Sequence, residues 1–254
     1  MNNLREAQIK MIQILNFVKK FCEENEIEYW LDYGTLLGAV RHSGFIPWDD
    51  DIDLGMDRKN YEKFYKLFPK ELSEKNPLYY CKKLKKDYLK IRIKENYLLK
   101  KDGTKEEMNI DIFPYDYYDK KIINLLNKQC YYQNLKIKNK KTLGDKIKNI
   151  SIKLQRKYYK NILKRKLEYK INKGTFKEFN KNSCMGLGFK TEMNIIVTYP
   201  EIIFPLRNLE FEGNNYFVPN NYSEYLTSVY GDYMKLPPLE ERHGHSDVIK
   251  YVLK

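Results

Sequence analysis

The sequence of 254 residues has few cysteines and no long apolar run. Its four cysteines are widely separated and form no Cys-x-x-Cys pair, which excludes the common zinc spacings and a disulfide framework. No apolar stretch reaches the ~20 residues that a membrane-spanning helix needs. The N-terminal segment carries Glu6 and lacks the apolar core of a signal peptide. We therefore expect a soluble, cytoplasmic protein with reduced cysteines.

Acidic residues are nearly missing from one segment of the chain. Residues 120–173 contain 18 Lys and Arg against two acids, whereas the remainder contains 29 against 32. The net charge of +13 therefore belongs to this segment. Such a block is usually a solvated face, but it can also bind anionic lipid or nucleic acid. Because no recognised nucleic-acid-binding motif accompanies it, we expect no nucleic-acid partner.

Hydrophobic periodicity predicts helices and strands in the first quarter of the chain. Apolar residues at helical spacing predict a helix over residues 3–24, and the β-branched and aromatic run 27–33 predicts a strand. Gly34 should end that strand, and Thr35 should cap a short helix through residue 40 or 41.

The following segments alternate between the same two periodicities. DDIDLGM predicts a second strand, and residues 60–68 predict a helix that Pro69 ends. Residues 87–93 and 108–116 predict two further strands, the latter stopped by Pro114.

The basic segment and the C-terminal part complete the pattern. Apolar residues three to four positions apart predict a long amphipathic helix over residues 146–173, with Lys and Arg around its polar face. Residues 204–219 predict a hairpin that turns at Gly213-Asn214, and a helix end and a Pro-rich loop follow.

Four aspartates occupy five consecutive positions in GTLLGAVRHSGFIPWDDDIDLGM. Alternate side chains of a strand share one face, so Asp51 and Asp53 should point the same way, with Ile52 and Leu54 on the buried side. Two carboxylates at this spacing can supply oxygen ligands to Mg²⁺. A surface turn or a helix-cap cluster is the alternative reading of such a motif.

A second acidic unit strengthens the metal-site reading. Asp111 stands between two isoleucines, so a strand carrying it could lie beside the strand of Asp51 and Asp53. Three acids on two neighbouring strands form a two-metal phosphoryl-transfer layout. Gly34 and Thr35, at a strand-to-helix junction, would direct backbone N–H groups toward an anion.

These residues carry a resemblance to a known family. LDYGTLLGAVRHSGFIPWDDDIDLGM closely resembles the signature of the LicD family, which includes bacterial phosphocholine transferases and eukaryotic fukutin-related proteins. NIDIFPYD, FEGNNYFVP and YLTSVYGDYMKLPP resemble further segments of that family. The resemblance extends from Glu28 to about His245 and is weak over residues 120–181. The zinc-binding cysteines of the fukutin-related branch have no counterpart, which favours the bacterial branch.

The resemblance implies a fold and an activity. The fold is nucleotidyltransferase-like and α+β, with a small mixed sheet flanked by helices and an additional helical part. We expect one domain, with a core of residues 1–118 and 182–254 and a basic helical insertion at 119–181. The implied activity transfers a phospho-alcohol, typically phosphocholine from CDP-choline, to a sugar hydroxyl with release of CMP. The acceptor would be a glycan, free or lipid-linked, such as lipopolysaccharide, capsule or teichoic acid.

Roles for the acids and for the phosphate site follow from this resemblance. Asp51 and Asp53 would bind Mg²⁺ or Mn²⁺, and Asp111 would be a shared ligand or the base that accepts the acceptor's proton. Gly34 and Thr35 would hold the donor diphosphate. Arg41 would clamp a phosphate or form a surface salt bridge.

Weaker candidates stand beside them. The further phosphate-binding candidates are Lys90, Arg92, Arg242 and His245, and each can instead belong to a solvated face or loop. A quaternary ammonium group would bind an aromatic pocket, for which the candidates are Tyr33, Trp48 and Tyr115, although core packing is the default role of each.

Several activities remain open from sequence. Donors with ribitol, glycerol or ethanolamine would suit the same acids, and a nucleotidyltransferase that uses a nucleoside triphosphate would release pyrophosphate instead. A non-catalytic basic module that binds RNA or lipid is the third alternative. The basic helix 146–173 could rest on the anionic inner face of a membrane, where lipid-linked acceptors lie, or form a solvated outer face.

Overall fold

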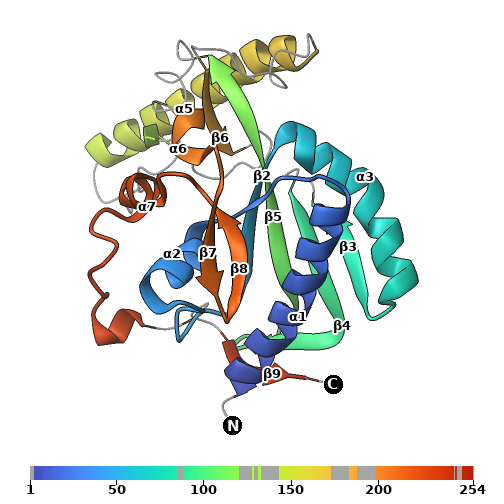
Figure 1. The fold of residues 1–254 in the computed structure, drawn as a ribbon. Helices are drawn as coiled ribbons and strands as arrows, with labels where there is room; N and C mark the ends of the chain where they lie inside the picture. Colours follow the sequence, from blue (N-terminus) through green and yellow to red (C-terminus); the bar gives the residue numbers. More distant parts are fainter. Residues whose placement is uncertain are drawn as a thin grey trace. The chain divides into compact units, whose positions relative to one another are not determined.

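The computed structural model describes residues 3–84, 88–119, 128, 131–132, 143–172, 183–187, 198–242, 244 and 248–253. The chain divides into two compact units, one of residues 1–115 and 201–254 and the other of residues 116–200. Figure 1 shows the elements of both units. The functional boundaries expected from sequence, near residues 118 and 182, stay a prediction.

A mixed β-sheet forms the centre of the first unit. Its strands are β1 (Trp30–Leu31), β2 (Ile52–Asp57), β3 (Tyr79–Lys83), β4 (Leu89–Lys100), β5 (Lys105–Asp119) and β9 (Val248–Val252). The order is β1-β2-β5-β4-β3, and β9 pairs with β4. Only β2 and β5 run parallel among these pairs of described strands. The expected small mixed sheet is confirmed.

Helices and a hairpin flank this sheet. They are α1 (Asn3–Glu24), α2 (Tyr33–His42), α3 (Arg58–Lys75), α7 (Tyr222–Tyr230), the 3₁₀ helix η2 (Leu239–Glu241), and the hairpin strands β7 (Arg207–Phe211) and β8 (Asn214–Val218). The short helix α6 (Pro200–Ile203) begins at the boundary of the two units. Figure 1 shows α2 beside β2 and α3 beside β3. The predicted first helix and the hairpin are confirmed, although the hairpin turns at Glu212-Gly213.

The alternation in β2 separates an apolar face from a polar one. Ile52, Leu54 and Met56 are fully buried, and Asp53 between them is partly exposed. Burying each apolar side chain contributes about 1.5–3 kcal/mol. A shift of one residue in register would place the aspartate in the core, so the apolar face fixes where Asp53 points.

The junction after β1 differs from the expectation. The predicted strand over 27–33 is reduced to β1, and the helix begins at Tyr33 with Asp32, not Thr35, as its N-cap. The Asp32 carboxylate accepts the Tyr33 N–H at 2.9 Å. Aspartate is at least as good an N-cap as threonine, and Asp32 precedes Thr35 along the chain. The helix therefore begins after Asp32, and Thr35 lies inside α2.

Two prolines do not end their elements as predicted. Pro69 lies within α3, because Phe64, Phe68 and Leu72 continue the buried helical face around it. Pro114 lies within β5 and pairs with Met56. The β4 pairing of β5 ends at residue 112, so β4 requires no N–H from the proline.

The second unit contains the basic helix. α5 (Leu143–Asn172) confirms the predicted helix, apart from Lys173, which lies outside the described residues. β6 (Ser183–Leu187) pairs with β5, and the Tyr118 hydroxyl donates to the Leu187 carbonyl at 2.6 Å. Among the described residues, no helix has the length and apolar character needed to cross a membrane.

Candidate active site

Asp53 and Asp111 are direct neighbours in the sheet. They are Cα partners across the parallel β2–β5 pair, so their side chains leave the sheet on the same face. The expectation that the two acidic strands lie side by side is confirmed. The sheet therefore holds two carboxylates next to each other from segments almost 60 residues apart in sequence.

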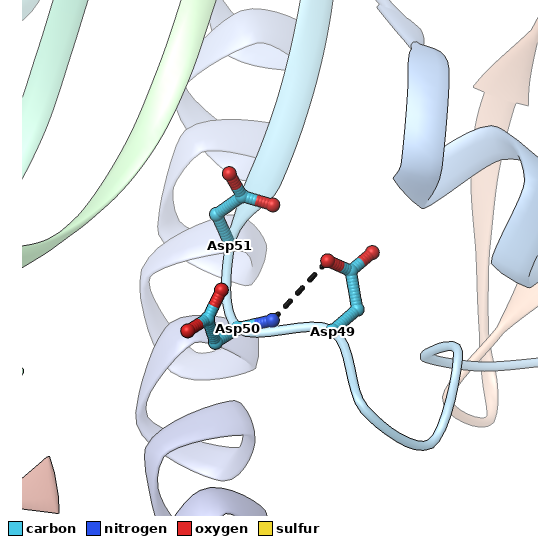
Figure 2. Close-up of side chains that lie close together, drawn as sticks. All are labelled: Asp49, Asp50 and Asp51. Atoms are coloured by element: carbon cyan, nitrogen blue, oxygen red, sulfur yellow. Dashed lines mark hydrogen bonds between the residues drawn. The ribbon is translucent and has the colours of Figure 1, made fainter. Parts of the chain in front are cut away.

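Three further carboxylates gather where the chain enters β2. One oxygen from each of Asp49, Asp50 and Asp51 lies within 4.8 Å of the other two (Figure 2). The Asp50 N–H donates to Asp49 Oδ1 at 3.2 Å and connects two of these residues. The Tyr251 hydroxyl donates to Asp50 Oδ2 at 3.2 Å. This is the group of oxygen ligands that the described residues offer to a divalent cation.

Burial and the charges of neighbouring acids perturb the titration of Asp53. The pKa of Asp53 is raised well above its ordinary value, first by burial and then by the charges of Asp51, Asp111 and Asp49. Like charges at close range disfavour the ionised forms, and a bound cation removes that penalty. The electrostatics of these residues therefore fit a cation among them.

Asp111 is held by two neighbours on the same face. Its Oδ2 lies 3.0 Å from Lys90 Nζ, and Asn109 Nδ2 donates to its Oδ1 at 2.8 Å. Lys90 Nζ also donates to Asn109 Oδ1 at 3.2 Å, which closes a buried network of three residues. Burial raises the pKa of Asp111 to about 6, although Lys90 acts in the opposite direction. The carboxylate is thus fixed in orientation and can hold a proton near neutral pH.

The first turn of α2 supports the acids. Thr35 is buried, and its Oγ1 accepts the backbone N–H of Asp53 at 2.9 Å. A Cβ added at Gly34 would lie 2.9 Å from Asp49 Oδ2, so the glycine leaves room for that carboxylate. In the structure, Thr35 therefore binds the backbone of Asp53, and Gly34 leaves space for Asp49.

Two arginines lie at the end of α2 and in the C-terminal loop. Arg41 Nη1 donates to the Tyr233 carbonyl at 2.9 Å, and burial lowers the pKa of Arg41. Arg242 Nε donates to the Pro237 carbonyl at 2.8 Å, and its guanidinium lies 5.9 Å from the ring centre of Trp48. Each arginine also interacts electrostatically with the other. Backbone carbonyls thus orient both guanidinium groups, and that of Arg242 lies near one predicted aromatic residue, Trp48.

The other predicted residues take different places. Arg92 Nη1 lies 3.2 Å from Glu107 Oε2, and the ring of Tyr33 packs against Phe113 at 5.8 Å. Tyr115 is fully buried and packs against Trp30 at 5.0 Å. His245 lies outside the described residues. Tyr33 and Tyr115 interact with each other, whereas Trp48 lies beside Arg242, so a common aromatic pocket of all three stays a prediction.

Asp32 is a site-supporting residue that the sequence analysis did not single out. It is fully buried and accepts hydrogen bonds from the hydroxyls of Tyr115 and Tyr225, the former at 2.7 Å. Burial raises the pKa of Asp32 to about 6, against the lowering effect of both tyrosines. Its position before the helix at Tyr33 was a usable N-cap signal.

Asn109 and Tyr230 were also missed. Asn109 stands two residues before Asp111, so strand alternation alone places both on one face. The pKa of Tyr230 is raised by burial and then by the charges of Asp53 and Asp32. No local pattern connects Tyr230, at the end of α7, with acids that precede it by well over a hundred residues.

Comparisons with known proteins agree with this geometry. Residues 26–143 match the family described as LicD/FKTN/FKRP, nucleotidyltransferase domain. The chain is 32% identical over 272 aligned residues to the lipopolysaccharide cholinephosphotransferase LicD of Haemophilus influenzae, and the match covers 98% of each chain. It is 28% identical over 102 residues to the ribitol 5-phosphate transferase FKRP of Mus musculus, which covers 39% of this chain and 19% of that protein.

Proposed function

Because the chain belongs to the LicD family, we propose that it is a metal-dependent phosphotransferase of CDP-linked alcohols. It moves a phospho-alcohol, with phosphocholine the first candidate, from the CDP donor to a hydroxyl of a cell-surface glycan and releases CMP. The observation that carries this proposal is the pairing of Asp53 with Asp111 beside the aspartates at 49–51. The full-length similarity to a cholinephosphotransferase supports it.

A divalent cation, Mg²⁺ or Mn²⁺, fits the acids at the entry to β2. Asp51 and Asp53 are the proposed ligands from sequence, and Asp49 adds a further oxygen ligand close to Asp51. Asp111 is the third proposed ligand or, alternatively, the base. Bound there, the cation would neutralise charge on the donor phosphates during transfer.

Three basic groups are the proposed ligands of the donor phosphates. Lys90 lies next to Asp111 on the sheet, and Arg41 and Arg242 lie at the end of α2 and after η2. Phosphate has the charge and geometry to bind guanidinium groups in a bidentate manner. Gly34 would contribute its backbone N–H at the start of α2 and leave space for Asp49. Arg92 would bind a phosphate only after its ion pair with Glu107 is broken.

Asp111 is the residue that can remove the acceptor's proton. Its pKa of about 6 leaves it largely ionised at neutral pH and still able to accept a proton. Lys90 keeps the carboxylate ionised, and Asn109 sets its orientation. In this role Asp111 would accept the hydroxyl proton as the sugar oxygen attacks the distal phosphorus.

The alcohol is assigned by similarity and by aromatic residues. Trp48 lies beside Arg242, close to the proposed phosphate site, and a quaternary ammonium group binds well over an aromatic face. Tyr33 is near Asp53 and could extend this aromatic surface. Tyr115 is fully buried and would support the surface without contacting the donor. Ribitol, glycerol and ethanolamine phosphate are the alternative groups, as FKRP's name illustrates for ribitol.

The acceptor is proposed to be a lipid-linked or free glycan precursor. Lipopolysaccharide is the first candidate because of the Haemophilus relative's name, and capsule and teichoic acid are alternatives. We propose that the enzyme is cytoplasmic and meets lipid-linked acceptors at the inner face of the membrane.

The test is thermal stability of the full chain with Mg²⁺ or Mn²⁺ and a panel of CDP-choline, CDP-ribitol, CDP-glycerol, CDP-ethanolamine, CTP and ATP. A ligand at about 100 times its Kd should add about 2.7 kcal/mol of stability. Asp51→Asn with Asp53→Asn should abolish the metal-dependent shift. Asp57→Asn is the matched control, because Asp57 caps α3 from the same strand and asparagine caps equally well.

The products separate the alternatives. Release of CMP with one CDP-alcohol establishes the phosphotransferase and identifies its donor, whereas pyrophosphate from a nucleoside triphosphate establishes a nucleotidyltransferase. A non-catalytic RNA- or lipid-binding module would give no product, and the Asp51→Asn/Asp53→Asn variant would behave as the wild type. Either of the last two results would overturn the proposal.

A further inference from the structure

Helix α5 packs on its own unit through one side. Asn149 and Ile152 are 4% and 6% exposed, and Arg156 and Tyr159 follow them at helical spacing and are half-buried. Arg156 Nε donates to the Tyr132 carbonyl at 2.7 Å, and the Tyr159 ring stacks on that of Tyr132 at 5.3 Å. These contacts define the inward side of the helix.

The opposite side of α5 carries an apolar ridge. Ile147, Ile150, Leu154 and Tyr158 are 61%, 58%, 63% and 57% exposed. Their spacing of three to four residues places them in one line, about 16 Å long at 1.5 Å per residue. Single exposed apolar side chains are ordinary, but four in one line form a continuous patch. We call these four residues the α5 ridge.

Positive charge follows the ridge. Residues 146–165 contain eight Lys and Arg and no Asp or Glu. Lys146, Lys153, Lys157 and Lys160 are exposed, and helical spacing places them along one flank of the ridge. Two copies of such a helix would repel each other, so this charge favours an anionic partner over a second copy of the chain.

We propose that the α5 ridge inserts into the surface of an anionic lipid bilayer, with the flanking lysines on lipid phosphates. Apolar side chains enter the boundary of the acyl chains, and lysines beside them bind headgroups, as interfacial helices do. Nucleic acid would use the lysines but offers no apolar layer for aliphatic side chains. None of the ridge residues is a proposed active-site residue. The ridge adds a membrane-binding element to the proposed function, on which its biological use rests.

The experiment is cosedimentation of the full chain with vesicles of phosphatidylcholine alone or with about 30% phosphatidylglycerol. We expect binding only to the anionic vesicles, weakened by salt. Ile150→Ser with Leu154→Ser should weaken binding at least about tenfold. Leu78→Ser with Leu239→Ser is the matched control, since these residues are 63% and 77% exposed elsewhere, and it should bind as the wild type. A second variant, Lys146→Gln with Lys153→Gln and Lys157→Gln, should also lose at least about tenfold.

Three results would overturn the proposal. They are a wild type that does not bind anionic vesicles, equal binding to both vesicle types, and a ridge variant that binds as the wild type. Binding to single-stranded RNA in place of vesicles, or a ridge-dependent dimer without vesicle binding, would identify a different partner and would also overturn it. The vesicle assay contains no donor or metal, so its failure leaves the metal-dependent thermal shift, and with it the phosphotransferase proposal, unaffected.

Discussion

Thr35 Oγ1 accepts the backbone N–H of Asp53 at 2.9 Å and thereby joins the first turn of α2 to the acidic strand. The Asp32 N–H donates to the Asp53 carbonyl at 2.9 Å and forms a second connection. Both the N–H and the carbonyl of Asp53 are therefore hydrogen-bonded to residues at the start of α2. The position of its carboxylate depends on the helix junction as well as on the sheet.

Replacing Thr35 with valine should separate this positioning from general packing. Thr35→Val keeps the shape of the side chain but leaves the Asp53 N–H without its acceptor, at a cost of about 1–3 kcal/mol. We expect kcat to fall about tenfold or more with a smaller change in KM. Steady-state kinetics with the CDP-alcohol found in the panel provides the measurement. Thr35→Ser retains the oxygen and should recover most of kcat, and equal losses in both variants would contradict the role.

Gly34→Ala should weaken metal binding without destabilising the fold. The new Cβ would lie 2.9 Å from Asp49 Oδ2 and displace that carboxylate from the acidic group. Alanine is favoured over glycine in a helix by up to about 1 kcal/mol, so the melting temperature should not fall. Calorimetric titration with Mn²⁺ should show weaker binding. Unchanged affinity would mean that Asp49 takes no part in holding the cation.

Tyr225→Phe should destabilise the protein by removing a hydroxyl from Asp32. A hydrogen bond to a charged group contributes about 1.5–3 kcal/mol, and each kcal/mol shifts Tm by about 2–4 °C at this chain length. Thermal unfolding followed by circular dichroism measures the shift. Tyr222→Phe, on the same helix, is the control, because Tyr222 is only half-buried. Equal melting of the two variants would show that the buried hydroxyl contributes no stability.

Glu212 should make stability depend on pH in the acidic range. Arg5 donates to its carboxylate at 2.9 and 2.6 Å and the Phe45 N–H at 3.0 Å, and the Arg5 hydrogen bond lowers the pKa of Glu212. A lowered carboxyl pKa stabilises the fold above the unfolded value of about 4.3, and the contribution is lost as the pH falls through the folded pKa.

The Glu212→Gln variant tests this dependence. It should melt below the wild type at pH 7, and the difference should shrink as the pH is lowered from about 5 toward 3. Glu210→Gln, an exposed carboxylate on β7, should show little difference at any pH. A difference between Glu212→Gln and wild type that stays constant with pH would locate the effect in packing instead of charge.

The sequence predicted what depends on local periodicity. The alternation around Asp53 predicted a polar face and a buried face in β2, and the isoleucines around Asp111 predicted a second strand of the same kind. The pairing of these two strands could be expected because a small sheet offers each strand few possible neighbours. The hairpin and the helix over residues 3–24 were equally local features, although the hairpin turn lies at Glu212-Gly213, one residue before the predicted Gly213-Asn214.

Features that depend on tertiary contacts were missed or misplaced. A proline predicts the end of a helix at Pro69, but the buried aromatic face of α3 outweighs the missing hydrogen bond. The pairing of Lys90 with Asp111 could not be predicted, because strand register is set by contacts across the sheet. The position of Tyr230 near the acids depends on how α7 packs, which no local pattern encodes.

The hydrogen bond between Asp32 and Tyr225 joins residues 193 positions apart. During synthesis, the first helices and strands leave the ribosome long before α7 does. Until Tyr225 has been synthesised, the Asp32 carboxylate lacks one of its two tyrosine partners and remains solvated. Folding of the acidic site should therefore finish only after synthesis has passed Tyr225, and a nascent chain arrested before that residue should not yet bind the cation as the finished protein does.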